Sequence, residues 1–283
     1  MAIEYNKIDV GEGNYKISPS QLTTFYRNPK EWLDILNGNN PFKGNDSTLM
    51  GTCIHYIFET QFKDITEDEY WKDVREYLNK EVLYETINEF QMNHILKTIS
   101  DVYPTIVNWI NNSDECNTIH SEVEVKYKLP KSITGETKHD YYIAGSIDAI
   151  IEDNTAKSES PFGIRDYKTS KRKVSNIDNY LHQLVTYAVA WNATHPKDQQ
   201  VGFVEVVNIP ITKKGIDFNI IRKYITKELI DNIETILKEI VLTHKTIVKY
   251  PELTNIVFRE GVDFMGRLKP LEGEEMQKTK SSV

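Results

Sequence analysis

Two carboxylates and a lysine in neighbouring apolar segments are the strongest chemical signal in the sequence. Asp148 lies within the apolar run 147–151, and Asp166 and Lys168 lie towards the end of the run 162–169. Side chains two residues apart in a strand share a face, so Asp166 and Lys168 point the same way. If the two strands are neighbours, two carboxylates with a carbonyl and waters form an oxygen cage suited to Mg²⁺. A lysine beside that cage would contact a phosphate or orient an attacking water.

An acid two residues before a lysine is a common pattern, and it occurs three times here, at Glu124, Glu136 and Asp166. Glu136 lies in a polar, glycine-containing turn, and Glu124 alternates with apolar residues as on an exposed strand face. Asp166 instead follows an apolar run, where an acid without a partner is costly to bury. Asp148 lies in a similar environment. We therefore interpret Asp148 and Asp166 as functional.

Two further pairs of polar residues have the four-residue spacing that places side chains on one helix face. His55 and Glu59 would be able to join one metal site. Taken alone, this pair is better explained as a partly exposed histidine with a helical glutamate partner. Gln183 and Tyr187 lie within an otherwise apolar stripe. Taken alone, they are better explained as a core tyrosine with a hydrogen-bonded glutamine.

A basic run, Lys171, Arg172 and Lys173, follows Lys168. Such a run is usually a solvated loop, but beside a metal site it also suits contact with a phosphate backbone. The whole chain is acidic, because 34 Lys+Arg against 42 Asp+Glu give a net charge of −8. That balance argues weakly against a surface that binds nucleic acid everywhere. It leaves a local site open, because partners respond to local fields.

The composition is that of a folded chain, with 39% hydrophobic and 27% charged residues over 283 positions. Only two cysteines are present, Cys53 and Cys116. They exclude a disulfide framework, a four-cysteine zinc site and an iron–sulfur cluster. The sequence has no secretory signal pattern at its start and no apolar run near the roughly 20 residues that span a bilayer. We therefore expect a soluble, cytoplasmic protein without a membrane partner.

The elements that position these residues follow from the spacing of apolar side chains. Ser18 and Pro19 have the residue types of a helix N-cap and first helical position. Pro104 is expected to interrupt one helix. The strands from 119 to 169 are expected to be antiparallel neighbours, and 211–221 to pair with the buried strand before it. Helices are predicted within 18–36 and over 49–62, 67–82, 84–111, 177–194 and 225–246, and strands over 119–129, 141–151, 162–169 and 201–209.

This order predicts an α/β fold with a central mixed β-sheet flanked by helices and a helical insertion. We expect one domain over residues 1–269 and a flexible polar tail over 270–283. Neither of the common glycine-rich phosphate loops occurs. Within the domain, the predicted parts are N-terminal core helices over 17–62, the helical insertion over 63–116 and the α/β core over 117–246.

Five motifs in fixed order resemble the PD-(D/E)XK nuclease superfamily, and more narrowly its RecB-like branch. The resemblance covers residues 17 to about 210 and implies a restriction-endonuclease-like core. The five together are specific, whereas the acid-x-lysine triplet alone is not. The motifs are Ser-Pro-Ser-Gln-Leu at 18–22, Gly-Thr-x-x-His at 51–55, Ser-Ile-Asp at 146–148, Asp-Tyr-Lys-Thr at 166–169 and Gln-x-x-x-Tyr at 183–187.

The resemblance implies Mg²⁺ as the cofactor, with Mn²⁺ as a substitute. Asp148 and Asp166 would be the metal-binding acids, and His55 the additional ligand of the RecB-like branch. The backbone carbonyl of Tyr167 would be a further ligand. Lys168 would be the catalytic lysine.

Residues around this implied metal site would support it or bind DNA. Gln183 and Tyr187 match the motif that supports the site and contacts DNA. The basic run 171–173 would hold the DNA strand. Glu122, in the first predicted strand, and Glu59 are looser candidates.

Two departures from the family pattern narrow the group of relatives that the chain resembles. Ile147 stands where the superfamily's name has a proline, as is common in the RecB-like branch. Relatives with an iron–sulfur cluster need four cysteines, so that cofactor is excluded. The chain therefore resembles free-standing exonucleases of phages and mobile elements related to RecB and RecE. Its richness in Asn, Ile and Lys fits an AT-rich genome.

The expected function is a metal-dependent DNA nuclease, an exonuclease of phage or bacterial DNA recombination, replication or repair. DNA is the expected partner, and the resemblance leaves room for a single-strand annealing or replication protein. One alternative is a catalytically inactive nuclease fold that serves as a DNA-binding or assembly module. Such proteins tend to lose the acids or the lysine, which are present here. A second alternative is a hydrolase of small phosphoesters. Strand polarity, preference for single or double strands, endonuclease action and oligomeric state stay open.

Overall fold

The computed structural model describes residues 3, 8–38, 44–112, 117–170, 177–212, 215–253 and 274–275. Its strands are β1 (Tyr15–Ile17), β2 (Asn117–Lys128), β3 (Tyr141–Glu152), β4 (Phe162–Ser170), β5 (Phe203–Thr212), β6 (Gly215–Ile216), β7 (Asn219–Tyr224) and β8 (Glu274–Glu275). Its α-helices are α1 (Leu22–Arg27), α2 (Pro29–Leu36), α3 (Asp46–Phe62), α4 (Glu67–Leu83), α5 (Glu89–Asn112), α6 (Lys131–Thr134), α7 (Ile177–Thr194) and α8 (Lys227–Lys249). Short 3₁₀ helices are η1 (Pro19–Gln21), η2 (Lys197–Gln199) and η3 (Pro251–Leu253).

The strands form one mixed sheet in the order β1-β3-β4-β5-β7-β8, with β2 also on β3 and β6 on β5. The pairs β2–β3 and β3–β4 are antiparallel, as predicted. The pairs β1–β3 and β4–β5 are parallel, and β5–β7 is antiparallel. The predicted fold class, α/β with a central mixed sheet, is therefore confirmed.

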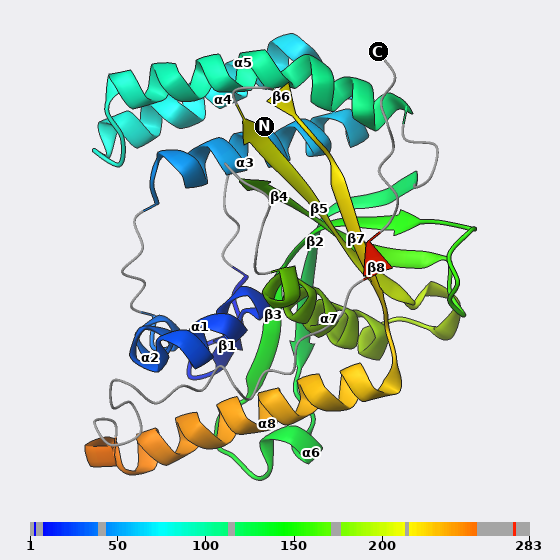
Figure 1. Cartoon of the computed structure of the whole chain (residues 1–283). Coiled ribbons are helices and arrows are strands. Elements are labelled where there is room, and N and C mark those ends of the chain that lie inside the picture. Colours follow the sequence, from blue (N-terminus) through cyan, green and yellow to red (C-terminus); the bar gives the residue numbers. More distant parts are fainter. Residues whose placement is uncertain are drawn as a thin grey trace.

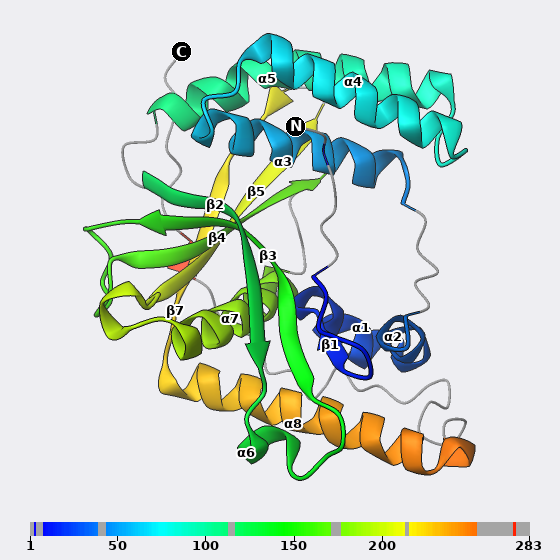
Figure 2. The ribbon, with the colours of Figure 1, turned by 180° about the vertical axis from the view of Figure 1, so that it is seen from behind.

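Helices cover both faces of this sheet (Figures 1 and 2). The helices α3, α4 and α5 pack on one face around a core that contains Ile57, Ile99 and Val207. The helices α1, α2, α7 and α8 pack on the other face around a core that contains Trp32, Val185 and Leu237. The strand β5 lies between the two cores and is buried along its first eight residues. Its apolar sequence fits this position, because both of its faces are covered.

The start of the chain contains a strand that the sequence did not predict. The strand β1 has only three residues and pairs with β3 in parallel register, Tyr15 opposite Tyr141. A run of three residues is too short to show a period of two. The next element begins as predicted, with Ser18 as N-cap and Pro19 in the first turn of η1.

The helix α5 differs from its prediction in two ways. It begins at Glu89 rather than at residue 84, because Asn88 and Gln91 cap it by reciprocal side-chain to backbone hydrogen bonds. It also continues through Pro104, where an interruption was predicted. The proline is exposed, while Tyr103 and Ile106 beside it are buried. Packing of the inner face therefore outweighs the one hydrogen bond that proline removes.

Some predicted features fall outside the described residues. The basic run 171–173 is one of them. Of the predicted tail 270–283, the structure describes only β8, which pairs with β7. None of the helices in the described part of the chain is long and apolar enough to cross a membrane.

Candidate active site

The strands β3 and β4 separate at the place where the two predicted acids lie. Their ladder stops at the pair Ala149–Arg165. One step further in the same register, Asp148 would face Asp166. There the Oδ2 atom of Asp148 accepts the backbone N–H of Tyr167 at 2.9 Å. A carboxylate thus accepts a strand N–H at the point where the ladder has ended, and the fork brings the two acids together.

His55 reaches this fork from α3. Its Nδ1 atom lies 3.3 Å from Oδ2 of Asp148. The helix is held against β4 by the ring of Phe58, which stacks on the ring of Tyr167 with centroids 3.7 Å apart and planes at 14°. Phe58 is one turn after His55, so this stack fixes the part of the helix that carries the imidazole.

Lys168 lies on the same face of β4 as Asp166, as the spacing predicts. Its Nζ atom is 2.6 Å from Oδ1 of Asp166 and 5.2 Å from the ring centroid of Tyr180 on α7. The other carboxylate oxygen of Asp166, Oδ2, is buried and has no hydrogen-bond partner within the described part of the chain. Asp166 therefore keeps one oxygen available for a ligand.

A cavity of about 660 Å³ opens in front of the fork. It lies between α3 on one side and β2, β3 and the segment around β1 on the other. Asp166 and Lys168 are not in its wall. Of the predicted site residues, those in the wall are His55, Glu59, Glu122, Asp148 and Tyr187.

Burial shifts the proton affinities of these groups. It raises the pKa of Asp166 to about 6, where Lys168 opposes the rise and repulsion by Asp148 adds to it. Burial also raises the pKa of Glu122 to about 7, again with a contribution from Asp148. The pKa of His55 falls to about 4, because burial and the charge of Lys168 disfavour the imidazolium. The site therefore holds a neutral imidazole and carboxylates whose negative charges need a nearby cation.

The chemistry of these side chains fits a divalent metal. Asp148 and Asp166 supply carboxylate oxygens, and one oxygen of Asp166 has no partner. Such oxygens, with a backbone carbonyl and waters, are the ligands that Mg²⁺ and Mn²⁺ prefer. In the residues that the structure describes, however, no three His, Cys, Asp or Glu side chains are placed to hold a metal ion together. The donor set is present, and Lys168 occupies one oxygen of Asp166.

Glu122 lies in β2 with an unusual backbone. Its φ of 51° is in the left-handed region, although its neighbours in β2 pair regularly with Ile147 and Ala149 of β3. Non-glycine residues seldom adopt this conformation inside a strand, and such strain concentrates at functional sites. The Glu122 carboxylate accepts a hydrogen bond of 3.0 Å from Ser146. The second loose candidate, Glu59, forms an ion pair with Lys63.

The two residues of the predicted support motif differ in their environment. Tyr187 is buried and lines the cavity, with its hydroxyl against the backbone of Gly145. A Cβ atom at position 145 would overlap that hydroxyl. Gln183 is partly exposed and lies outside the cavity wall.

Sequence reasoning missed two aromatic residues of the site. Phe58 stacks on Tyr167, and Tyr180 lies beside the Lys168 ammonium. Phe58 is one turn from His55, and Tyr180 is one turn from Gln183. Helix periodicity around the chosen motifs would have found both.

A comparison with protein families identifies the family of this chain. The model for the PD-(D/E)XK nuclease superfamily matches residues 16–256. The chain belongs to the PD-(D/E)XK nuclease superfamily. Membership implies hydrolysis of DNA, generally with divalent metals such as Mg²⁺. The α/β fold with its mixed sheet is consistent with the restriction-endonuclease-like fold of this superfamily.

Two further comparisons add little to the PD-(D/E)XK assignment. No curated protein matches the chain. A solved structure titled "Crystal structure of SSO0001" is similar at 14% identity, over 93% of this chain and 89% of that chain, with a TM-score of 0.33. A similarity at this level carries no argument about function.

Proposed function

We propose that this PD-(D/E)XK protein is a metal-dependent DNA exonuclease of the RecB-like branch. The observation that carries the proposal is the fork between β3 and β4. There Asp148 of β3 contacts His55 of α3 and the backbone N–H of Tyr167 of β4, and Lys168 binds Asp166 on β4. The order of the five sequence motifs supports the RecB-like branch.

Mg²⁺ would be held by Asp148, Asp166, His55 and the carbonyl of Tyr167. When bound, it supplies a water of lowered pKa and offsets negative charge on the phosphate. The protein's own residues prepare this site. The Tyr167 N–H holds Asp148 in place, and the neutral His55 imidazole offers a lone pair.

Lys168 acts through its positive charge. Burial favours its neutral form, but Asp166 and Asp148 outweigh burial and raise its pKa above the ordinary value. It is therefore an ammonium at neutral pH, which stabilises charge on the phosphate and orients the attacking water rather than removing a proton.

The size of the cavity supports an exonuclease. A volume of about 660 Å³ is typical of pockets that enclose a small molecule. It suits the end of one strand better than the width of a duplex. In this setting the substrate is a DNA end, the context is phage or bacterial recombination, replication or repair, and a single-strand annealing or replication protein is the expected partner.

The test is a time course on end-labelled linear DNA and on covalently closed circles, single- and double-stranded, with Mg²⁺, Mn²⁺ or EDTA. We expect metal-dependent loss of linear DNA alone. Lys168→Ala and Asp166→Ala should both abolish cleavage, and Lys168→Ala should still bind DNA. Loss of circles would instead indicate an endonuclease. Turnover by Lys168→Ala would refute the catalytic assignment, and DNA binding without cleavage by the wild type would favour the inactive module.

A further inference from the structure

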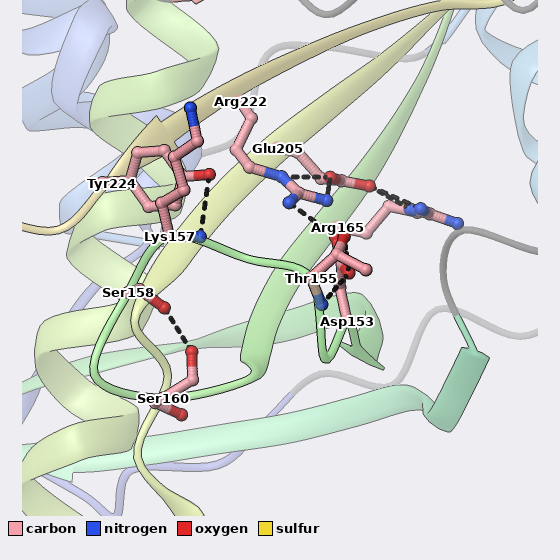
Figure 3. A network of polar contacts seen from close by, with 9 residues as sticks. All are labelled: Asp153, Thr155, Lys157, Ser158, Ser160, Arg165, Glu205, Arg222 and Tyr224. Atoms are coloured by element: carbon pink, nitrogen blue, oxygen red, sulfur yellow. Dashed lines mark hydrogen bonds and ion pairs between the residues drawn. The ribbon is translucent and has the colours of Figure 1, made fainter.

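Four buried charged side chains form a network of ion pairs next to the fork (Figure 3). Arg165 and Glu205 share strand faces with Tyr167 and Val207, which belong to the core against α3, α4 and α5. Arg165 of β4, Glu205 of β5 and Arg222 of β7 are neighbours in register across three strands. Asp153, just after β3, extends the set. Each side chain is at most 4% exposed. We call these four residues the ionic row.

The charges of the ionic row pair with one another. Arg165 binds Oε1 of Glu205 at 2.5 Å, and Arg222 binds Oε2 at 2.8 Å. Arg222 also binds Asp153 at 2.7 Å. Two cations thus neutralise two anions. Because desolvation offsets most of the attraction, such a cluster contributes little net stability, but removal of one partner is costly because it leaves a buried charge uncompensated.

The ionic row includes a residue of β4, the strand that carries Asp166 and Lys168. Arg165 forms the last rung with β3 before the fork and directly precedes Asp166. A slip of β4 by one residue would turn Asp166 and Lys168 to the opposite face. It would also pull Arg165 away from Glu205, leaving a buried guanidinium without its ion-pair partner while Glu205 keeps only Arg222. The ionic row therefore fixes the register of β4 on β5.

Arg165 also acts on Tyr167, which lies two residues further along the same face of β4. Burial raises the pKa of Tyr167, and the charge of Arg165 and a hydrogen bond from it oppose that rise. The ring of Tyr167 stacks on Phe58, and its N–H holds Asp148. One side chain thus connects the ionic row with a metal-binding acid and with the helix that carries His55.

We infer that Arg165 and Glu205 are positioning residues for the metal site, acting through Tyr167 and the register of β4. This inference rests on the proposed function. The test compares Arg165→Met, Glu205→Gln and Tyr167→Phe with Asp153→Asn as a matched control. Asp153 lies at the far end of the ionic row and touches neither Arg165 nor Tyr167 in the contacts described above. Tyr167→Phe keeps the stack on Phe58 and loses only the hydroxyl.

The readouts are Mn²⁺ binding by calorimetry without DNA, hydrogen exchange of peptides that cover 163–170, and kcat and KM on linear DNA. We expect about tenfold weaker Mn²⁺ binding in Arg165→Met and Glu205→Gln, with a smaller loss in Tyr167→Phe. Exchange in the peptides should be faster, and kcat should fall with KM nearly unchanged. Asp153→Asn should lower the melting temperature but leave Mn²⁺ binding intact, because Asp153 binds Arg222, and the contact between Arg165 and Glu205 is kept in this variant.

These measurements distinguish two roles of Arg165 and Glu205: positioning the metal site, or only stabilising the fold. Wild-type Mn²⁺ affinity in folded Tyr167→Phe and Glu205→Gln would overturn the inference, as would an equal loss in Asp153→Asn. If Arg165→Met does not fold, the other two variants still decide. A wild type that neither binds Mn²⁺ nor cleaves DNA would instead overturn the proposed function.

Discussion

Glu122 illustrates how a single residue couples the site to pH. Its folded pKa of about 7 lies above the ordinary 4.5, so without metal the folded protein binds more protons there than the unfolded chain. This contribution to stability is present at low pH and lost as pH rises from about 4.5 to 7. His55 and His244, with pKa values lowered to about 4, act in the opposite direction.

Comparison with Glu122→Gln isolates the contribution of Glu122, because both histidines are present in both proteins. The melting temperature of the variant minus that of the wild type should increase as pH rises from 5 to 8 in EDTA. Calorimetry at several pH values measures this difference. A constant difference would show that Glu122 titrates normally.

Gly145 makes room for Tyr187. In Gly145→Ala the new methyl group would displace the Tyr187 hydroxyl, which should cost about 1–3 kcal/mol of stability and lower nuclease activity. The double variant Gly145→Ala/Tyr187→Phe removes the overlapping oxygen and should recover most of the stability. Denaturant unfolding of the four proteins in this cycle measures the coupling. Strict additivity would contradict the described contact.

At the scale of elements, the seating of α3 on β4 determines where His55 lies. Phe58 is 8% exposed and stacks on Tyr167, whereas Phe62, one turn later, is 40% exposed. Phe58→Ala should cost about 3–5 kcal/mol and impair metal-dependent cleavage. Phe62→Ala is the matched control and should change neither the stability nor the cleavage activity appreciably. Chemical denaturation and the linear-DNA assay provide the comparison, and equal effects would argue against a special role for the stack.

The sequence predicted elements well where the pattern is local. Alternation over 119–129 and the buried run 201–209 predicted two of the strands, whereas β1 was too short to leave a pattern. Local patterns could not predict the site, because the contact of His55 with Asp148 joins residues 93 positions apart. Only the ordered motifs predicted that contact. Arg165 and Glu205 were missed, yet a charge in an apolar strand is the same signal that selected Asp166.

At the scale of the whole molecule, DNA binding can depend on the net charge or on the local charge of the basic run 171–173, and the two can be separated by experiment. Replacing Lys171, Arg172 and Lys173 by alanine takes the net charge from −8 to −11. We expect weaker DNA binding and a salt dependence of affinity that is shallower by about 2. The control replaces three exposed lysines, Lys197, Lys227 and Lys238, and makes the same change in net charge. Fluorescence anisotropy in a salt series compares the two, and identical losses would point to the overall charge.

The position of β5 late in the chain has a consequence for synthesis on the ribosome. Eight residues of β4 pair with β5, whereas only four pair with β3. The residues of β5 and β7 emerge only as translation approaches position 224 of 283. Until then β4 lacks its main neighbour, and Asp166 and Lys168 have no fixed place beside Asp148. A nascent or prematurely terminated chain that lacks β5 would therefore lack the arrangement of Asp148, Asp166 and Lys168 on which the proposed cleavage depends.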